Sequence, residues 1–314
     1  MTENRPHILS TNNDVFDLQY HLLNIKTITD NTKEVTSLLV LFDKRVASSS
    51  MDGTIHIYNP SNDFNCDIVI TTDVKSITSL SQLPNSHIVA SCYTSIFIFS
   101  ISLSSYELIS SYKGHHTNTI NKVLPLSNNR FASCSDDLTI KIWDTVNYSS
   151  PPLAVMKINY NNKSMLYIKE KEMLISLTNG TEFYIWSTVS YQLITTIKYN
   201  NWLCSGIFQV DSNRVFISAY QVLYILNINT FSIKDFGKYN RKINTFYSFI
   251  MLRDGKNLLA GASGSFLMID TKGMYMNCTV VGSLHQGYIT GLVNIDDKTF
   301  MSCSIDKTIR VMRY

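Results

Sequence analysis

The sequence predicts an all-β protein made of seven similar units, each with four short strands. One apolar run recurs along the chain at a regular spacing, and the segments between its copies alternate apolar and polar residues as strands do. The composition agrees with this prediction. Aromatic residues make up 11% of the 314 residues, with 18 tyrosines and 15 phenylalanines, and such residues favour strands. A chain of this length can bury the core of one large all-β domain.

The recurring run is clearest in "TIKIWD" at residues 139–144. Its seven copies share a large apolar or aromatic residue near the end, here called the anchor: Tyr58, Phe99, Trp143, Trp186, Leu226, Ile269 and Met312. Successive anchors lie 40 to 44 residues apart. This is the length of a propeller blade of four antiparallel strands. The sequence therefore predicts a seven-bladed β-propeller.

Within each unit, three short alternating runs are separated by turn residues. In the third unit they cover residues 119–126, 130–135 and 139–144, and Asn, Ser and Asp fill the turns between them. A fourth run, such as residues 106–113 or 191–198, leads to the next unit. Turn residues between alternating runs are typical of antiparallel strands.

The two ends of the sequence predict how the ring closes. The last unit stops at Tyr314, directly after its third run, and residues 20–28 precede the first unit as residues 106–113 precede the third. An unpaired blade edge would promote aggregation. We therefore expect residues 20–28 to form the outer strand of the last blade. The predicted organisation is an N-terminal extension, 1–19, followed by one propeller domain, 20–314.

The third unit also contains His115, Ser133, Asp137 and Trp143 at a characteristic spacing. This set resembles the WD40 repeat, and the resemblance extends over nearly the whole chain. It implies a hydrogen-bonded cluster of His, Ser, Asp and Trp within a blade, with the Asp six residues before the Trp. His115 follows Gly114 as the family's histidine does. The loop has one extra residue, however, so His116 is an alternative cluster member.

Other units keep only part of the set. The seventh unit has His285, Ser302 and Asp306, with Met312 in the Trp position, and the first unit keeps Asp52. The second, fifth and sixth units lack the Asp and have a shorter turn. We interpret the cluster as structural, because its polar groups can satisfy one another where burial would otherwise be costly.

The sequence favours no catalytic or cofactor chemistry. His115, Ser133 and Asp137 have the residue types of a nucleophilic triad, but the repeat accounts for all three. The chain contains no G-x-x-x-x-G-K-[ST] motif and no glycine-rich loop that opens a helix. Its six cysteines form no C-x-x-C pair, and three recur in one strand context, as small buried residues do. We expect no enzyme, no cofactor and no metal site.

Neither the net charge nor the N-terminal sequence points to a particular class of partner or to export. The 27 Lys and Arg residues nearly balance the 24 Asp and Glu residues, for a net charge of +3, which indicates neither nucleic acid nor membrane as a partner. The N-terminal residues do not form the pattern of a signal peptide, and no apolar run is long enough to cross a bilayer. Free cysteines favour a reducing compartment. The expected location is the cytoplasm, with the nucleus as the alternative.

The WD40 resemblance also implies a binding face, where the loops of all blades meet around the central channel. Two sets of positions commonly line that face. The first lies directly before the inner strand of each blade and comprises Glu34, Thr119, Lys163, Trp202, Lys242 and Tyr288. The second lies directly before the turn Asp and comprises Met51, Asp136 and Ile305. Aromatic and basic side chains at the centre of a face are typical interface residues.

From this face we predict a non-catalytic scaffold or adaptor that binds a protein or peptide, within a larger complex. The alternative is a propeller subunit of the ribosome or of another ribonucleoprotein. The chain is similar in size to the receptor for activated C kinase family. Where that family's first blade has the arginine of its ribosome contact, this sequence has Met51. Steep salt dependence of binding would indicate phosphate contacts and so the nucleic-acid alternative.

Overall fold

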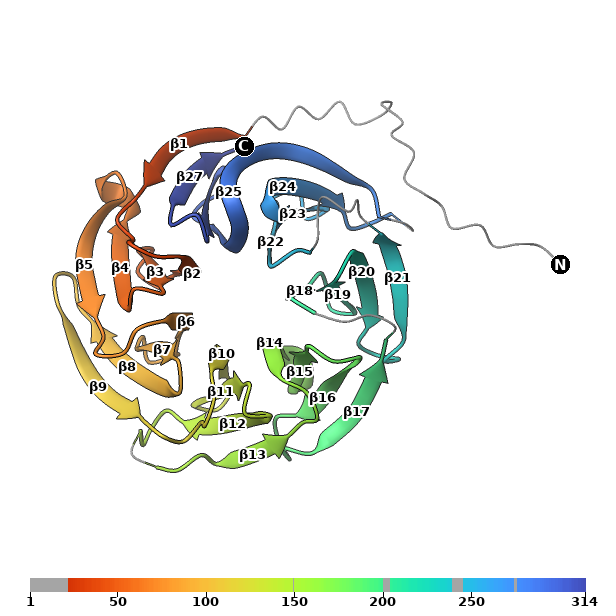
Figure 1. Cartoon of the computed structure of the whole chain (residues 1–314). Helices are drawn as coiled ribbons and strands as arrows, with labels where there is room; N and C mark the ends of the chain where they lie inside the picture. The colour runs from red at the N-terminus through yellow and green to blue at the C-terminus, as the bar shows by residue number, and fades with distance from the viewer. Residues whose placement is uncertain (1–21, 149, 200–203, 239–244, 274–275) are drawn as a thin grey trace.

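A computed structural model describes residues 22–148, 150–199, 204–238, 245–273 and 276–314. They form a closed ring of antiparallel blades around a central channel (Figure 1). The seven-bladed, all-β fold predicted from the repeat is confirmed. The only helices within the described ranges are two short 3-10 turns, η1 (Pro60–Asn62) and η2 (Lys169–Lys171). No helix in this part of the chain is long and apolar enough to cross a membrane.

Blades one to five are separate sheets of four consecutive strands, which run from the channel outward. Blade one contains β2 (Val35–Val40), β3 (Val46–Ser50), β4 (Thr54–Asn59) and β5 (Asn65–Thr71). Blade two contains β6 (Ile77–Gln82), β7 (Ile88–Cys92), β8 (Ser95–Ile101) and β9 (Tyr106–Tyr112). Blade three contains β10 (Ile120–Leu126), β11 (Arg130–Ser135), β12 (Thr139–Asp144) and β13 (Ala154–Lys157).

The next two blades follow the same pattern. Blade four contains β14 (Asn162–Ile168), β15 (Met173–Thr178), β16 (Glu182–Ser187) and β17 (Leu193–Lys198). Blade five contains β18 (Gly206–Gln209), β19 (Arg214–Ala219), β20 (Val222–Asn227) and β21 (Ile233–Lys238). The strand bounds lie within a few residues of the runs predicted from alternation.

Blades six and seven share one long strand, β25 (Cys278–Asn294). Its first half pairs with β24 (Ser263–Asp270) and its second half pairs with β26 (Thr299–Ser304). It is therefore the outer strand of blade six and the inner strand of blade seven. The remaining strands of these blades are β22 (Ser248–Met251), β23 (Asn257–Gly261) and β27 (Ile309–Arg313).

The ring closes through the strand nearest the N-terminus, as predicted. β1 (Leu23–Ile28) pairs antiparallel with β27, from Leu23 opposite Arg313 to Ile28 opposite Ile309. In Figure 1, β1 lies along the outside of blade seven and leads into blade one. Within the predicted segment 20–28 the strand begins at Leu23. Residues 20 and 21 and the predicted extension 1–19 lie outside the described residues.

The core lies between neighbouring blades. All seven anchors are buried, and Trp143 stacks on Phe131 with ring centroids 6.0 Å apart. At the closure, Ile28 of β1 packs in one cluster with Tyr58 of blade one and Val311 of blade seven. All six cysteines are free thiols, and the three in the repeated context, Cys92, Cys134 and Cys303, are fully buried. The apolar faces of the strands therefore hold adjacent blades together.

Polar side chains on the inner strands also link adjacent blades. The Thr36 hydroxyl of blade one donates to the Ile77 carbonyl of blade two at 2.7 Å. Across the closure, the Thr290 hydroxyl of blade seven donates to the Val35 carbonyl of blade one at 2.6 Å. Equivalent bonds to the next blade come from Thr78, Asn121 and Ser205. These bonds satisfy backbone carbonyl groups at or just before the first residue of the next blade's inner strand.

Candidate functional site

The WD40-like cluster of blade three is complete in the structure. His116 Nδ1 lies 2.7 Å from Asp137 Oδ2, and His116 Nε2 lies 2.7 Å from Ser133 Oγ. The indole N–H of Trp143 donates to Ser133 Oγ at 2.8 Å. Asp137 also accepts from the Thr139 hydroxyl at 2.6 Å. These contacts tie the loop before β10 to β11, β12 and the turn between them.

The cluster histidine is His116, which corrects the prediction of His115. The cluster position lies four residues before the inner strand, as His285 lies four residues before Ile289 in blade seven. His115 packs edge-on against Trp143, with ring centroids 5.3 Å apart. Its carbonyl accepts a hydrogen bond from the Lys141 ammonium group. The extra loop residue therefore places His115 at the rim of the cluster.

The hydrogen-bond directions favour a neutral imidazole in this cluster. Trp143 donates to Ser133, so the Ser133 hydroxyl can donate to His116 Nε2 while His116 Nδ1–H donates to Asp137. Burial lowers the pKa of His116 against the opposing effect of Asp137. Burial alone would raise the pKa of Asp137, but hydrogen bonds from Thr139, His116 and Thr117 outweigh it and lower that pKa. Every polar group of the cluster is then satisfied.

Blades seven and one keep parts of this arrangement. In blade seven, His285 lies 2.8 Å from Asp306 Oδ2 and 2.9 Å from Ser302 Oγ, and the buried Met312 replaces the Trp. In blade one, Asp52 accepts from the hydroxyls of Thr32 and Thr54 at 2.9 and 2.6 Å. The turn Asp therefore fixes its loop with or without a histidine.

The two predicted sets of face residues are adjacent in the structure. In each of three blades, the residue before the turn Asp donates its backbone N–H to the carbonyl of the residue before the inner strand. The pairs are Met51 with Glu34, at 2.9 Å, Asp136 with Thr119, at 2.9 Å, and Ile305 with Tyr288, at 3.1 Å. This places these six residues on the same face of the ring, around the mouth of the channel.

Lys163 does not offer a free cation on this face. Its ammonium group lies 2.8 and 3.0 Å from the two carboxylate oxygens of Asp136, and Asp136 also accepts from the Asn121 side chain at 2.8 Å. The pair joins blade three to blade four. Lys163 and Asp136 therefore neutralise each other, which the sequence prediction did not include.

The aromatic part of the predicted face is only partly described. Tyr288 packs against Tyr247 with ring centroids 5.2 Å apart, and Tyr247 is 38% exposed. Trp202 and Lys242 lie outside the described residues. The predicted face residue Tyr288 therefore forms an aromatic pair with Tyr247 between blades six and seven.

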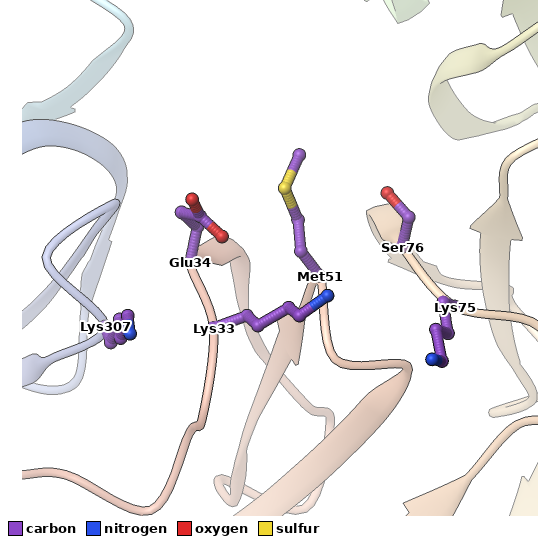
Figure 2. Close-up of a pocket in the computed structure, with 6 residues that line it drawn as sticks. All are labelled: Lys33, Glu34, Met51, Lys75, Ser76 and Lys307. Carbon is purple, nitrogen blue, oxygen red and sulfur yellow. The ribbon is translucent and has the colours of Figure 1, made fainter.

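A pocket of about 430 Å³ opens on this face between blades seven, one and two. Its lining, here called the lysine pocket, comprises Lys33, Glu34, Met51, Lys75, Ser76 and Lys307. In Figure 2, Glu34 and Met51 lie side by side and point the same way, with Lys307 on one flank and Lys75 and Ser76 on the other. Met51 is 38% exposed. The pocket thus combines an exposed thioether side chain with three cations.

The lysines of this pocket have no carboxylate partner within the described ranges, unlike Lys163 or Lys113. Sequence analysis did not identify them. Lys33 and Lys75 hold equivalent positions in blades one and two, each one residue before a face position, and Lys307 follows the turn Asp of blade seven. Of the three, only Lys33 lies directly beside a predicted position, since Lys307 follows Ile305 by two residues and the predicted sets contain no residue of blade two.

The channel itself forms another opening, with a volume of about 590 Å³. It is lined by residues on or beside the inner strands of all seven blades, including Lys122, Lys163 and Tyr167. Burial lowers the pKa of the Lys122 ammonium group. The wall mixes hydroxyl, amide and apolar groups with these two lysines, of which Lys163 is paired with Asp136.

Comparison with known families gives the same result as the geometry. The family model described as "WD domain, G-beta repeat" matches residues 23–59, 106–144 and 276–312. The chain is a WD40-repeat protein. The matched segments contain the whole cluster of blade three, from His116 to Trp143, and all the cluster residues of blade seven, from His285 to Met312.

Solved structures support the same WD40 fold. One of them, the crystal structure of the WD40 beta propeller domain of Doa1, superimposes with a TM-score of 0.77 at 14% sequence identity. The match covers 93% of this chain and 96% of that domain. Comparison with the curated proteins gave no match. At this identity the similarity shows the fold alone, and WD40 propellers in general serve as scaffolds for protein interactions.

Proposed function

We propose that this WD40 propeller is a non-catalytic scaffold that binds an acidic and apolar segment of a protein partner through the lysine pocket. The observation that carries the proposal is the arrangement of Lys33, Lys75 and Lys307 around the exposed Met51. Carboxylates of a partner can pair with the lysines while an apolar side chain packs on the methionine. A thioether side chain adapts its shape to different partners.

The lysines and the apolar side chains of this face should contribute to binding in different ways. Each exposed ion pair adds only about 0.2–1 kcal/mol and is screened by salt, so the lysines mainly set the rate of association and the choice of partner. Apolar contact supplies the remaining affinity. Met51 and Ile305 are 38% and 39% exposed, and the Tyr247–Tyr288 pair extends this apolar surface toward blade six. Trp202 and Lys242 remain predicted contacts of the same face.

The buried cluster supports a structural role for the residues that have triad chemistry. Ser133 is fully buried and His116 is 2% exposed. The Ser133 oxygen already interacts with His116 and Trp143. A substrate would have to open blade three to reach this hydroxyl. The arrangement therefore supports a scaffold rather than a hydrolase.

Selection from a phage-displayed random peptide library would test the proposal. The full chain and a variant with Lys33, Lys75 and Lys307 changed to Glu would be compared. A control variant with Lys169, Lys171 and Lys256 changed to Glu has the same net charge. These three lysines are exposed and lie in turns between first and second blade strands, at the ends of the blades opposite the lysine pocket.

We expect the natural chain and the control to enrich peptides with Asp or Glu beside a large apolar residue, and the pocket variant to lose that enrichment. Equal enrichment by all three proteins would reject the lysine pocket as the binding site. Binding of a mixed-sequence RNA with a steep salt dependence, without peptide enrichment, would instead favour the ribonucleoprotein alternative.

A further inference from the structure

Three side chains of types that bind transition metals meet at the seam where the ring closes. Asp30 lies in the loop directly after β1, His56 lies on β4, and Cys66 lies on β5. One potential ligand atom from each residue lies within 4.8 Å of the other two. The residues come from three separate segments, which explains why spacing along the sequence does not indicate a metal motif.

One pair already has nearly the separation of two zinc ligands. Cys66 Sγ lies 3.7 Å from His56 Nδ1. In a tetrahedral site with Zn–S of about 2.3 Å and Zn–N of about 2.0 Å, the sulfur and nitrogen lie roughly 3.5 Å apart. The Asp30 side chain is exposed on a loop, so small rotations can bring its carboxylate to the third position.

Neighbouring groups orient the imidazole for this role. Thr54 donates its hydroxyl to Asp52 Oδ1 at 2.6 Å. The Thr54 oxygen therefore acts as acceptor for His56 Nε2, which lies 3.0 Å away. The proton is thereby assigned to Nε2, and the lone pair of Nδ1 faces Cys66. Ligating histidines generally donate their second ring N–H in this way, and such support fixes both tautomer and ring orientation.

In blade one the Thr32–Asp52 bonds hold the loop to the turn, but the histidine link from the loop to the second strand is missing. Asn31 holds the position of His116 in blade three, yet it is 5% exposed and neither side-chain atom has a hydrogen-bond partner at ordinary distance. The hydroxyls of Ser48 and Tyr58, at the Ser and Trp positions, have no partner at ordinary distance either, although Ser48 and Asn31 lie close enough to Tyr58 to lower its pKa against the effect of burial. A tie through the neighbouring Asp30 would replace the missing cluster contact.

We propose that Asp30, His56 and Cys66 form a zinc site that fastens the closing strand to blade one. A thiolate, an imidazole and a carboxylate suit zinc better than magnesium or calcium, which prefer oxygen ligands alone. Water would complete the tetrahedron. Asp30 follows β1 by two residues, so the ion would link the closing strand to both β4 and β5. The Lys26–Asp63 ion pair, at 3.1 Å, already joins β1 to the segment between β4 and β5.

Binding requires loss of one proton, from the Cys66 thiol. Burial and the nearby Asp30 raise the pKa of this thiol, and Asp67 acts in the same direction. His56 faces it from β4, and burial lowers the pKa of that imidazole, so the imidazole is neutral at neutral pH. Asp30 and Asp52 act against burial on the pKa of the His56 imidazole. Tyr58, another titratable neighbour, is fully buried and has its pKa raised by burial. Since binding releases one proton, the apparent affinity should rise roughly tenfold per pH unit below the thiol pKa.

Cobalt titration of the reduced, chelator-treated full chain tests the site directly. Co²⁺ bound to a thiolate in a tetrahedral site gives a near-ultraviolet charge-transfer band and visible d–d bands. We expect both with one equivalent of Co²⁺, and loss of both when Zn²⁺ is added. The matched control is Cys278→Ser, which removes the other partly exposed thiol and should leave the spectrum unchanged. Absence of the charge-transfer band in the natural chain would overturn the proposal.

Variants then assign the ligands. Cys66→Ser should abolish the charge-transfer band, and Asp30→Asn, at an exposed position, should weaken Co²⁺ binding at least tenfold without affecting folding. Thr54→Val removes the acceptor for His56 Nε2 and should weaken binding roughly 10–100-fold. Zn²⁺ should raise the melting temperature of the natural chain and of Cys278→Ser but not that of Asp30→Asn. If the band persists in Cys66→Ser, or Zn²⁺ stabilises Asp30→Asn equally, the site is not formed by these residues.

Discussion

His116 and Asp137 are joined by a 2.7 Å contact between Nδ1 and Oδ2 that links the loop before blade three to the turn between its second and third strands. The same contact, at 2.8 Å, joins His285 to Asp306 in blade seven. Both pairs continue through a serine hydroxyl into the blade. The two complete His–Asp–Ser arrangements therefore tie the loop, the turn and the second strand together in blades three and seven, and blade seven is the one in which the ring closes.

Replacing Asp137 with Ala should lower the free energy of unfolding by about 1–3 kcal/mol, because His116 and Thr139 lose their acceptor inside the blade. Urea denaturation would measure the change. Asp67→Ala is a suitable control, since this exposed carboxylate on β5 has no hydrogen bond within the described part of the chain. The control should change stability by less than about 0.5 kcal/mol. Equal losses in the two variants would contradict the assigned role of Asp137.

Acid should destabilise the protein through the two cluster histidines. Burial lowers the pKa of His116 and of His285 in the folded state from the ordinary value of 6.5. Just below pH 6.5 the unfolded chain therefore binds more protons than the folded chain, so stability falls as the pH falls toward the lowered pKa values. Each histidine contributes at most about 1.4 kcal/mol per pH unit.

Urea denaturation at pH 7.5 and at pH 5.5 measures this effect. The natural chain should lose more stability between these two conditions than a variant with both His116→Gln and His285→Gln. The variant will itself be less stable at pH 7.5, so the quantity to compare is the loss on acidification. An equal loss in the two proteins would show that other groups cause the acid sensitivity.

Removal of the closing strand should open the ring. A chain that starts at residue 29 lacks β1, so β27 would have an unpaired edge and the cluster around Ile28 would lose a member. We expect aggregation or loss of the single cooperative melting transition. A chain that starts at residue 22 keeps β1 and serves as the control. If both chains melted as the full-length protein does, β1 would not be needed for closure.

Repeat spacing predicts the fold well because the anchors and the turn residues are local in sequence. Which residue of a loop enters the cluster is harder to predict. The single extra residue near His115 places His116, and not His115, in the cluster. Contacts between blades are not visible in the sequence at all. Lys163 and Asp136 lie 27 residues apart and neutralise each other only because the ring brings blades three and four together. Lys33, Lys75 and Lys307 likewise converge only after closure.

The binding face has one direct quantitative test. Calorimetric titration of a peptide selected by the natural chain would compare that chain with the variant carrying Lys33→Glu, Lys75→Glu and Lys307→Glu. The control carries Lys169→Glu, Lys171→Glu and Lys256→Glu. Each titration would be run at about 0.05 M and about 0.5 M NaCl, where screening of exposed charges differs strongly.

We expect the pocket variant to bind at least about tenfold more weakly than the control at low salt, because three attractive ion pairs become repulsive contacts. The difference between the two variants should shrink at high salt. Equal affinities for the peptide in the pocket variant and the control, at both salt concentrations, would contradict the claim that this propeller binds its partner through the lysine pocket.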